Sequence, residues 1–277
     1  MRKVNVIPNI ITAFGLACGL FVIFKVNMVE FGAGTYELLH ASALLLLVAA
    51  LADVLDGTVA RVMHAESEFG AMFDSLADAI SFGIAPSVLF LKYLSLEQGT
   101  GLSFFAVMGA MLFSIAGVLR LVRFNVKAHE AKDDPSAMQL QKKHFTGLPI
   151  PAGALTAVSS NMILASPYAV KFFPFSETTK AIVLTSVMIV LAYFMISRWK
   201  FPSLKALHFR VSSFHLVLVT VLLAIFVLYG ILYYFSIILL VVTWSYILIA
   251  WVLSLIRVIA GKKSKTLEDF EPDHEDF

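Results

Sequence analysis

Charged side chains are scarce in this sequence, since Asp, Glu, Lys and Arg make up only 14% of its 277 residues. A soluble domain carries about a quarter charged residues, because a polar surface must cover its core. Here 59% of the residues are hydrophobic and the mean hydropathy is +0.86. The composition therefore excludes a soluble globular protein.

Cysteine is nearly absent as well. The lone Cys18 lies in the first apolar run, so an intrachain disulfide is excluded. No cluster of histidine and cysteine offers the nitrogen and sulfur ligands of a zinc site. The sequence also shows no internal repeat and no low-complexity region, and we expect the acidic tail at 261–277 to be disordered.

The sequence contains several long apolar segments. A helix needs about 20 apolar residues to cross roughly 30 Å of hydrocarbon. Such segments lie near 8–27, 37–63, 70–94, 101–124, 149–168, 179–197, 212–229 and 231–257. They predict an all-α, polytopic membrane helical bundle of about eight transmembrane helices, with a six-helix core at 1–200 and an additional C-terminal helix pair at 201–260.

Two parts of this prediction are less regular than the rest. The fifth segment contains "PAGALTAVSSNMILAS", which is small and polar for a helix that faces lipid. The last two segments meet at a tight break near Tyr229 and Gly230, where a re-entrant pair is the alternative to two complete spans.

The basic residues set the expected orientation. With the N-terminus inside, 17 of the 21 Lys and Arg residues fall on the inner side, and only Lys25, Lys92, Lys171 and Lys180 fall outside. Loops rich in Lys and Arg stay in the cytoplasm. We therefore expect both termini in the cytoplasm, in an integral plasma (inner) membrane protein.

Four aspartates lie at the predicted cytoplasmic ends of the second and third spans. Asp53 and Asp56 are spaced i, i+3, and Asp74 and Asp78 are spaced i, i+4, so each pair projects from one helical face. An acidic group inside a span costs about 2.5–3.5 kcal/mol, and four like charges also repel. Solvation of a helix end explains one such residue, whereas four on two helices favour a metal site. Carboxylate oxygens suit Mg²⁺ or Mn²⁺, with Ca²⁺ as a further option.

Small residues accompany these aspartates. Gly57 and Ala60 share the face of the first pair, and Gly70 lies one turn before the second pair. They leave room for a bulky ligand and let the two helices approach closely. Plain helix packing is the alternative explanation, above all for Ala60.

The complete spacing D-x2-D-G-x2-A-R-x8-G-x3-D-x3-D resembles the signature of the CDP-alcohol phosphatidyltransferases. Its fixed positions are Asp53, Asp56, Gly57, Ala60, Arg61, Gly70, Asp74 and Asp78. The stretch "IPNIIT", with Asn9 and Thr12, is similar to the family's first span. Three further stretches, "SFGIAPS", "LRLVRFN" and "FTGLPIPAGA", resemble the phosphatidylserine synthases of this family. The resemblance covers roughly the first 155 residues and leaves the last three spans without a motif.

This resemblance implies a reaction. CDP-diacylglycerol would donate its phosphatidyl group to the hydroxyl of L-serine, with release of CMP, in a homodimeric membrane enzyme with two Mg²⁺ or Mn²⁺ ions. By analogy with the family, Asp53, Asp56 and Asp74 would bind the metal, and Asp78 would complete the site and act as general base. The CDP-lipid would lie against the residues Asn9, Thr12, Gly57, Ala60, Arg61 and Gly70.

The acceptor, or a phosphate, would be bound by Ser81, Arg120 and Arg123. The two arginines are spaced i, i+3 near the inner end of the fourth span, so they project from the same face. One explanation is ordinary flanking charge that attracts anionic lipid head groups. The other is recognition of the serine carboxylate or of a donor phosphate, which arginine binds in a bidentate manner. Arg61 would hold a phosphate or pair with one of the aspartates.

The sequence leaves two rival functions open. One is a related transferase whose acceptor is glycerol 3-phosphate or inositol phosphate, and such an acceptor requires extra basic residues for its phosphate. The other is a cation transporter, whose site is expected near the bilayer midplane between broken helices. The aspartates lie nearer the cytoplasmic ends of their helices, which argues against transport.

Overall fold

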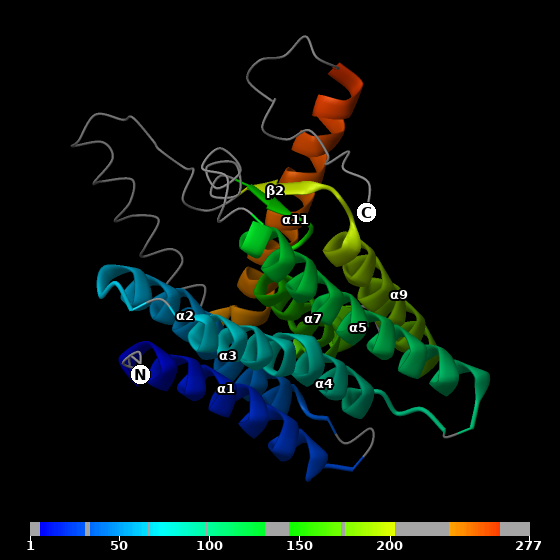
Figure 1. Ribbon diagram of the computed structural model, residues 1–277. Helices are drawn as coiled ribbons and strands as arrows, with labels where there is room; N and C mark the ends of the chain where they lie inside the picture. The colour runs from blue at the N-terminus through cyan, green and yellow to red at the C-terminus, as the bar shows by residue number, and fades with distance from the viewer. Residues whose placement is uncertain are drawn as a thin grey trace, which may run out of the picture.

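The computed structural model describes residues 6–30, 34–65, 67–97, 99–130, 144–172, 175–202 and 233–260. Its helices and strands are α1 (Val6–Asn27), α2 (Tyr36–Val62), α3 (Glu68–Asp78), η1 (Ala79–Ile84), α4 (Ala85–Tyr93), α5 (Gly101–Glu130), β1 (His144–Thr146), α7 (Ile150–Ala165), α8 (Pro167–Phe172), α9 (Glu177–Ile196), β2 (Lys200–Pro202) and α11 (Phe235–Ala260). In Figure 1, α1 to α4 lie together on one side of the bundle and α5, α7 and α9 on the other, while α11 crosses behind them.

Six helices in the described part of the chain are long and apolar enough to cross a membrane, which confirms an integral membrane protein. They are Val6–Asn27, Tyr36–Val62, Glu68–Tyr93, Gly101–Val126, Glu177–Ile196 and Phe235–Ile256. The predicted fifth span is the shorter apolar helix Ile150–Ala165. The predicted seventh span at 212–229 and the tail at 261–277 lie outside the described residues, so the count of eight is still a prediction.

The strands β1 and β2 were not predicted. They form a short antiparallel pair with Phe145 opposite Phe201. This pair joins the segment before α7 to the segment after α9, so the described part of the bundle is helical apart from this small ribbon. Strands of three residues carry too little periodicity to be found in a sequence.

The first span packs against the third through glycines. A Cβ atom on Gly19 would lie 2.7 Å from the Cα of Ser81, and the Ser81 hydroxyl donates a hydrogen bond to the carbonyl of Gly15 at 3.4 Å. Only helices without side chains at the contact approach this closely, which is the usual role of a small-xxx-small pattern in membranes. Helix α1 also packs against α2 and α3, so it connects the two helices that carry the aspartates.

The third span is interrupted by a π-helical turn, η1, directly after Asp78. A π turn leaves a backbone carbonyl without its usual helical partner, and here Ser114 of α5 donates to the carbonyl of Gly83 at 2.9 Å. Ser87 donates to the carbonyl of Ala110 on α5 at 3.1 Å. These bonds fix the wide turn and set the direction of the side chains that follow Asp78.

Helix α7 is the central helix of the bundle, which explains its small, polar sequence. It packs against α2, α4, α9 and α11, and ten of its sixteen residues are buried. Ser159 shares a hydrogen bond with Thr243 of α11 at 3.2 Å, and Trp244 of α11 donates to the Ser160 hydroxyl at 3.0 Å. Trp244 is thus a packing residue that joins α11 to α7.

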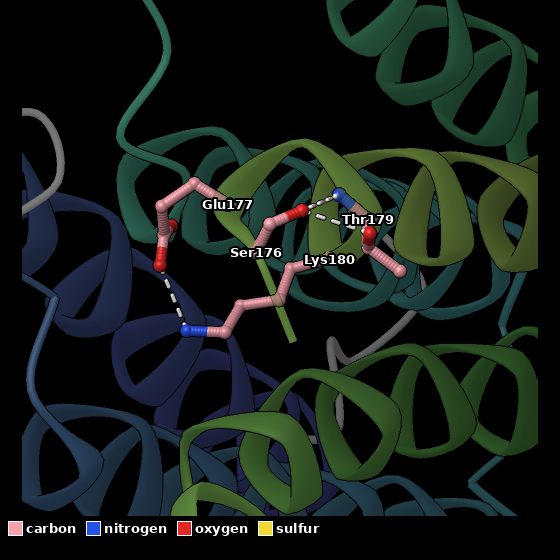
Figure 2. A network of polar contacts seen from close by, with 4 residues as sticks. All are labelled: Ser176, Glu177, Thr179 and Lys180. Atoms are coloured by element: carbon pink, nitrogen blue, oxygen red, sulfur yellow. Dashed lines mark hydrogen bonds and ion pairs between the residues drawn. The ribbon is translucent and has the colours of Figure 1, made fainter. Parts of the chain in front are cut away.

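The two ends of α9 are fixed differently. At its start, Ser176 accepts a hydrogen bond from the backbone N–H of Thr179, and Lys180 bonds Glu177 at 2.8 Å (Figure 2). At its far end, the guanidinium of Arg123 on α5 donates to backbone carbonyls of the residues Thr146, Met195, Ile196 and Ser197. Arginine therefore caps α9 and ties it to α5 and β1.

Gly147 is required at this junction. Its φ is +79°, and a Cβ atom would clash with the carbonyl oxygen of Met195 and lie 2.7 Å from the Arg123 guanidinium. We expect Gly147→Ala to lower the apparent melting temperature in detergent strongly, because backbone strain and a steric clash act together.

Gly99 is the matched control for this prediction. Its φ is +81°, but no atom lies within 4 Å of its added Cβ. Gly99→Ala should therefore show only the strain, about 1–2 kcal/mol. Both variants are compared by thermal unfolding of the purified protein. If Gly99→Ala lowers the apparent melting temperature as much as Gly147→Ala does, the steric explanation is wrong.

Candidate active site

An open pocket of about 200 Å³ lies between α1, α2 and the third span. Its walls are Thr12, Gly15, Leu16, Ala49, Asp53, Asp56, Asp74, Ala77, Asp78, Ser81 and Phe82. Six of these residues were predicted from the sequence as site residues, and they come from three separate helices and the π turn. The structure therefore gathers the four aspartates, Thr12 and Ser81 around one space.

Three of the carboxylates are close enough to share an ion. Oxygen atoms of Asp53, Asp56 and Asp74 all lie within 4.8 Å of one another. Asp56 is buried, with 4% of its surface exposed, and its Oδ2 accepts a hydrogen bond from the Thr12 hydroxyl at 2.5 Å. Thr12 thus orients one carboxylate, as the neighbours of metal ligands usually do.

The pocket carries more negative than positive charge. Asp53, Asp74 and Asp78 interact electrostatically with one another, and the buried arginine that interacts with Asp53 and Asp78 is Arg120. Arg61 is exposed and donates to the Thr58 hydroxyl at 3.2 Å. One guanidinium does not balance four carboxylates in a medium of low polarity, so this arrangement of oxygen ligands fits divalent cations.

The other residues that the sequence predicted to bind the CDP-lipid lie along the ends of the same helices. The Cβ position of Gly70 is 3.3 Å from the side-chain oxygen of Asn9, so α1 and α3 meet here. The Cβ position of Gly57 is 3.5 Å from the guanidinium of Arg61. Ala60 lies one turn further along α2 and is half-buried.

The second and third spans contact one another at η1, and carboxylate oxygens of α2 and α3 lie within 4.8 Å of one another. Helix α3 packs on α1, whereas α2 contacts the third span at η1. Helix α1 packs against both α2 and α3, and the pocket is lined by residues of all three helices. Gly70 thus allows close packing of α3 on α1, whereas an added Cβ on Gly57 would meet only the Arg61 guanidinium.

The two arginines predicted as one anion-binding pair are in different environments. Arg120 is buried, with 8% of its surface exposed, and its Nε atom has no hydrogen-bond partner among the described residues. Arg123 is occupied with the carbonyls at the end of α9. The geometry separates a group that faces the pocket charges from one that caps a helix.

Sequence reasoning missed several lining residues and the π turn. Gly15 and Leu16 of α1, Ala49 of α2 and Phe82 of η1 complete the pocket walls. The spacing of Gly15 and Gly19 was a readable signal for close packing of the first span. No comparable sequence signal marks the π turn.

A helical membrane bundle with an aspartate cluster at one end defines a class of metal-dependent membrane enzyme. The family model for CDP-alcohol phosphatidyltransferase matches residues 5–195. The chain belongs to this family, and the matched range contains all the pocket residues.

Several curated relatives bear the name CDP-diacylglycerol–serine O-phosphatidyltransferase. The protein from Helicobacter pylori strain 26695 is 32% identical over 212 residues, which is 76% of this chain and 78% of the relative. The protein from Bacillus subtilis is 31% identical over 201 residues, covering 73% of this chain and 92% of the relative. An archaeal protein from Methanocaldococcus jannaschii is 32% identical over 166 residues, covering 60% and 65%.

Proposed function

We propose that this protein is a CDP-diacylglycerol–serine O-phosphatidyltransferase, which transfers a phosphatidyl group to L-serine and releases CMP. Family membership and the names of the relatives support the reaction. The observation that carries the proposal is the pocket itself, where four aspartates from two helices surround a space beside a buried arginine.

The four aspartates have different roles in this proposal. Asp53, Asp56 and Asp74 would hold the metal, since their oxygen atoms already lie within 4.8 Å of one another. When bound, two Mg²⁺ or Mn²⁺ ions would neutralise the donor's phosphates and the charge that develops on the departing CMP. Thr12 keeps the Asp56 carboxylate oriented for this purpose.

Asp78 is the proposed general base. It lies beside Asp74 on the pocket wall and directly before the π turn. A serine hydroxyl is a weak nucleophile until its proton is removed, and a carboxylate within hydrogen-bond reach removes it as the new P–O bond forms. Ser81, on the next turn, is the proposed neighbour of the acceptor.

The donor would enter along the ends of α1, α2 and α3. Asn9, Gly57, Ala60, Arg61 and Gly70 lie there, and the small residues leave room for the cytidine and the phosphates. The exposed guanidinium of Arg61 offers charge to a phosphate. Arg123 is not part of the proposed substrate site, because its guanidinium donates to the carbonyls at the end of α9.

The proposal also includes an orientation, an assembly and a domain division. The asymmetry of Lys and Arg supports a pocket that opens to the cytoplasm and places both termini there. A six-helix core at 1–200 would be followed by a C-terminal helix pair at 201–260. The exposed apolar face of α5, including Phe104 and Met111, is available to lipid or to a second copy in a homodimer.

An acceptor screen tests the function. We expect the purified protein in detergent to release CMP from CDP-diacylglycerol only when L-serine and Mg²⁺ or Mn²⁺ are both present, and removal of the metal with EDTA to stop the release. Glycerol 3-phosphate and inositol phosphate, offered at equal concentration, should give no more CMP than a reaction without acceptor.

The screen also identifies the rival. CMP release that requires glycerol 3-phosphate or inositol phosphate, and not serine, assigns the protein to another branch of the family. Release that is independent of any divalent ion contradicts the role given to Asp53, Asp56 and Asp74.

A further inference from the structure

The π turn η1 connects the part of the third span that carries aspartates to the part that packs in the core. Asp78 directly precedes the turn, and Ser81 and Phe82, which belong to it, line the pocket. Beyond the turn, Ala85 and Phe90 of α4 are fully buried. The turn therefore adjoins both the pocket and the packed interior of the bundle.

The turn also sets how these two parts face relative to each other. Its hydrogen bond runs from the backbone N–H of Ala85 to the carbonyl of Ile80, five residues earlier instead of four. One extra residue in a turn rotates everything that follows by about 100°, the angle per residue of an α-helix. If η1 closed to a regular α-helical turn, Asp78 and the buried face of α4 would no longer both point as they do.

The third span has few bonds of its own to hold this turn. Pro86 has no N–H to offer the carbonyl of Phe82, four residues earlier, so the helix lacks one backbone bond at this place. A proline interrupts helices in several ways and does not by itself select a π turn. Side-chain bonds are therefore needed to fix the geometry.

Helix α5 supplies such bonds. The hydroxyl of Ser114 donates to the carbonyl of Gly83 at 2.9 Å, whereas Ser87 reaches the same carbonyl only at 3.4 Å. Ser87 also donates to the carbonyl of Ala110 at 3.1 Å. The backbones approach closely because α5 carries Gly117 here, whose Cβ position is 3.7 Å from the Gly83 Cα. Ser114 is thus the principal partner of the turn on α5.

The turn is held from two helices. Ser81 donates to the carbonyl of Gly15 on α1 at 3.4 Å, and Ser114 on α5 holds Gly83, two residues after Ser81. The bond from Ser81 is long and the bond from Ser114 is of ordinary length, so Ser114 is the stronger support. Ser114 is absent from the pocket wall, which means that it acts on the pocket only through η1.

We propose that Ser114 is a positioning residue for the acceptor: its hydroxyl holds the π turn so that Ser81 stays beside the base Asp78. This inference rests on the proposed function and deepens it, because η1 carries or adjoins the residues assigned to the acceptor. Asp53 and Asp56 lie on another helix, and Asp74 lies a turn before η1, so metal binding should not depend on Ser114.

The test is the kinetics of Ser114→Ala, which removes the hydroxyl. We expect kcat/KM for serine to fall about tenfold, because a small misplacement of the acceptor lowers the rate strongly. The KM for CDP-diacylglycerol and the Mn²⁺ concentration for half-maximal activity should change less than about twofold. Ser114→Thr keeps the hydroxyl and should restore kcat/KM to within about threefold of the wild type. If Ser114→Ala is not obtained in folded form, Ser114→Cys, a weaker donor of similar volume, takes its place.

Two controls separate positioning from a general loss of packing. Ser159→Ala removes a buried hydroxyl that joins α7 to α11, and it should lower thermal stability without a selective effect on serine. Ser103→Ala removes a half-buried hydroxyl near the start of α5 and should leave both properties unchanged. Wild-type kinetics for Ser114→Ala contradict the proposal. So does a Ser114→Thr variant that is as impaired as Ser114→Ala, since the hydroxyl is then not the cause.

The outcomes separate the inference from the function. Wild-type protein that responds to another acceptor and not to serine contradicts the proposed function, and the same comparison of Ser114→Ala with Ser114→Thr is then made with that acceptor. A loss confined to the donor or to the metal dependence contradicts only the role given to Ser114. Wild-type protein that releases CMP with none of the acceptors contradicts both.

Discussion

Asp78→Asn should lower kcat by about 10²–10⁴-fold, the usual contribution of a positioned general base. The amide has nearly the same shape as the carboxylate, but it does not accept the proton of the serine hydroxyl. Asp78 lies on the pocket wall before the π turn, where its charge adds to that of Asp53 and Asp74. Loss of one of these like charges should not destabilise the fold, so thermal unfolding should be unchanged.

The measurement is CMP release at saturating serine, with donor binding followed separately. Glu68→Gln is the matched control, since Glu68 is an exposed acid at the start of the same helix and should be dispensable. Addition of excess Mn²⁺ distinguishes the roles of Asp78. Activity that returns with metal makes Asp78 a ligand alone, and near-normal turnover removes it from the mechanism.

Much of the site could be predicted because its chemistry is concentrated in a short stretch. The spacing of Asp53, Asp56, Asp74 and Asp78 specifies faces on two helices, and helical periodicity is all that is needed to see each pair. Thr12 and Ser81 were found through resemblance. The structure places all six on the pocket wall, although their individual roles are still proposals.

The rest could not be predicted because it depends on contacts between distant segments. Gly57 and Gly70 suggested contact between two helices, but gave no sign that α1 packs against both of them. Arg120 lies one turn deeper in its span than Arg123, but only the structure shows that Arg123 donates to the carbonyls at the end of α9.

The membrane spans also include features that the sequence predicted and features that it could not predict. Apolar length alone gave the positions of α1, α2, α5 and α9 within a few residues, because crossing the bilayer imposes that length on each of them. Helix α7 is short and polar because it contacts protein on most sides, so the bilayer does not set its composition. The π turn depends on Ser114 of the neighbouring α5, which no window of the third span contains.

Asp56→Asn is expected to lower metal-dependent CMP release by about 10³-fold or more, because a lost charge at the metal site costs several kcal/mol and each 1.36 kcal/mol is a factor of ten. Asp56 is the buried member of the three carboxylates whose oxygens lie within 4.8 Å. Its neighbours Asp53 and Asp74 would remain, so residual binding should be weak. Direct Mn²⁺ binding to the purified protein checks this without reference to turnover.

Thr12→Val separates the charge of Asp56 from its orientation. The variant keeps all four carboxylates but removes the hydroxyl that donates to Asp56 Oδ2. Loss of such a supporting bond typically weakens metal affinity by about 10–100-fold. The concentration of Mn²⁺ or Mg²⁺ for half-maximal activity should rise accordingly, and high metal should restore turnover in Thr12→Val but not in Asp56→Asn. Ser186→Ala, which removes an exposed hydroxyl on α9, should leave the metal dependence unchanged. If Thr12→Val instead needs no more metal than the wild type, Asp56 is not held in place for an ion, and the common role assigned to the three carboxylates is wrong.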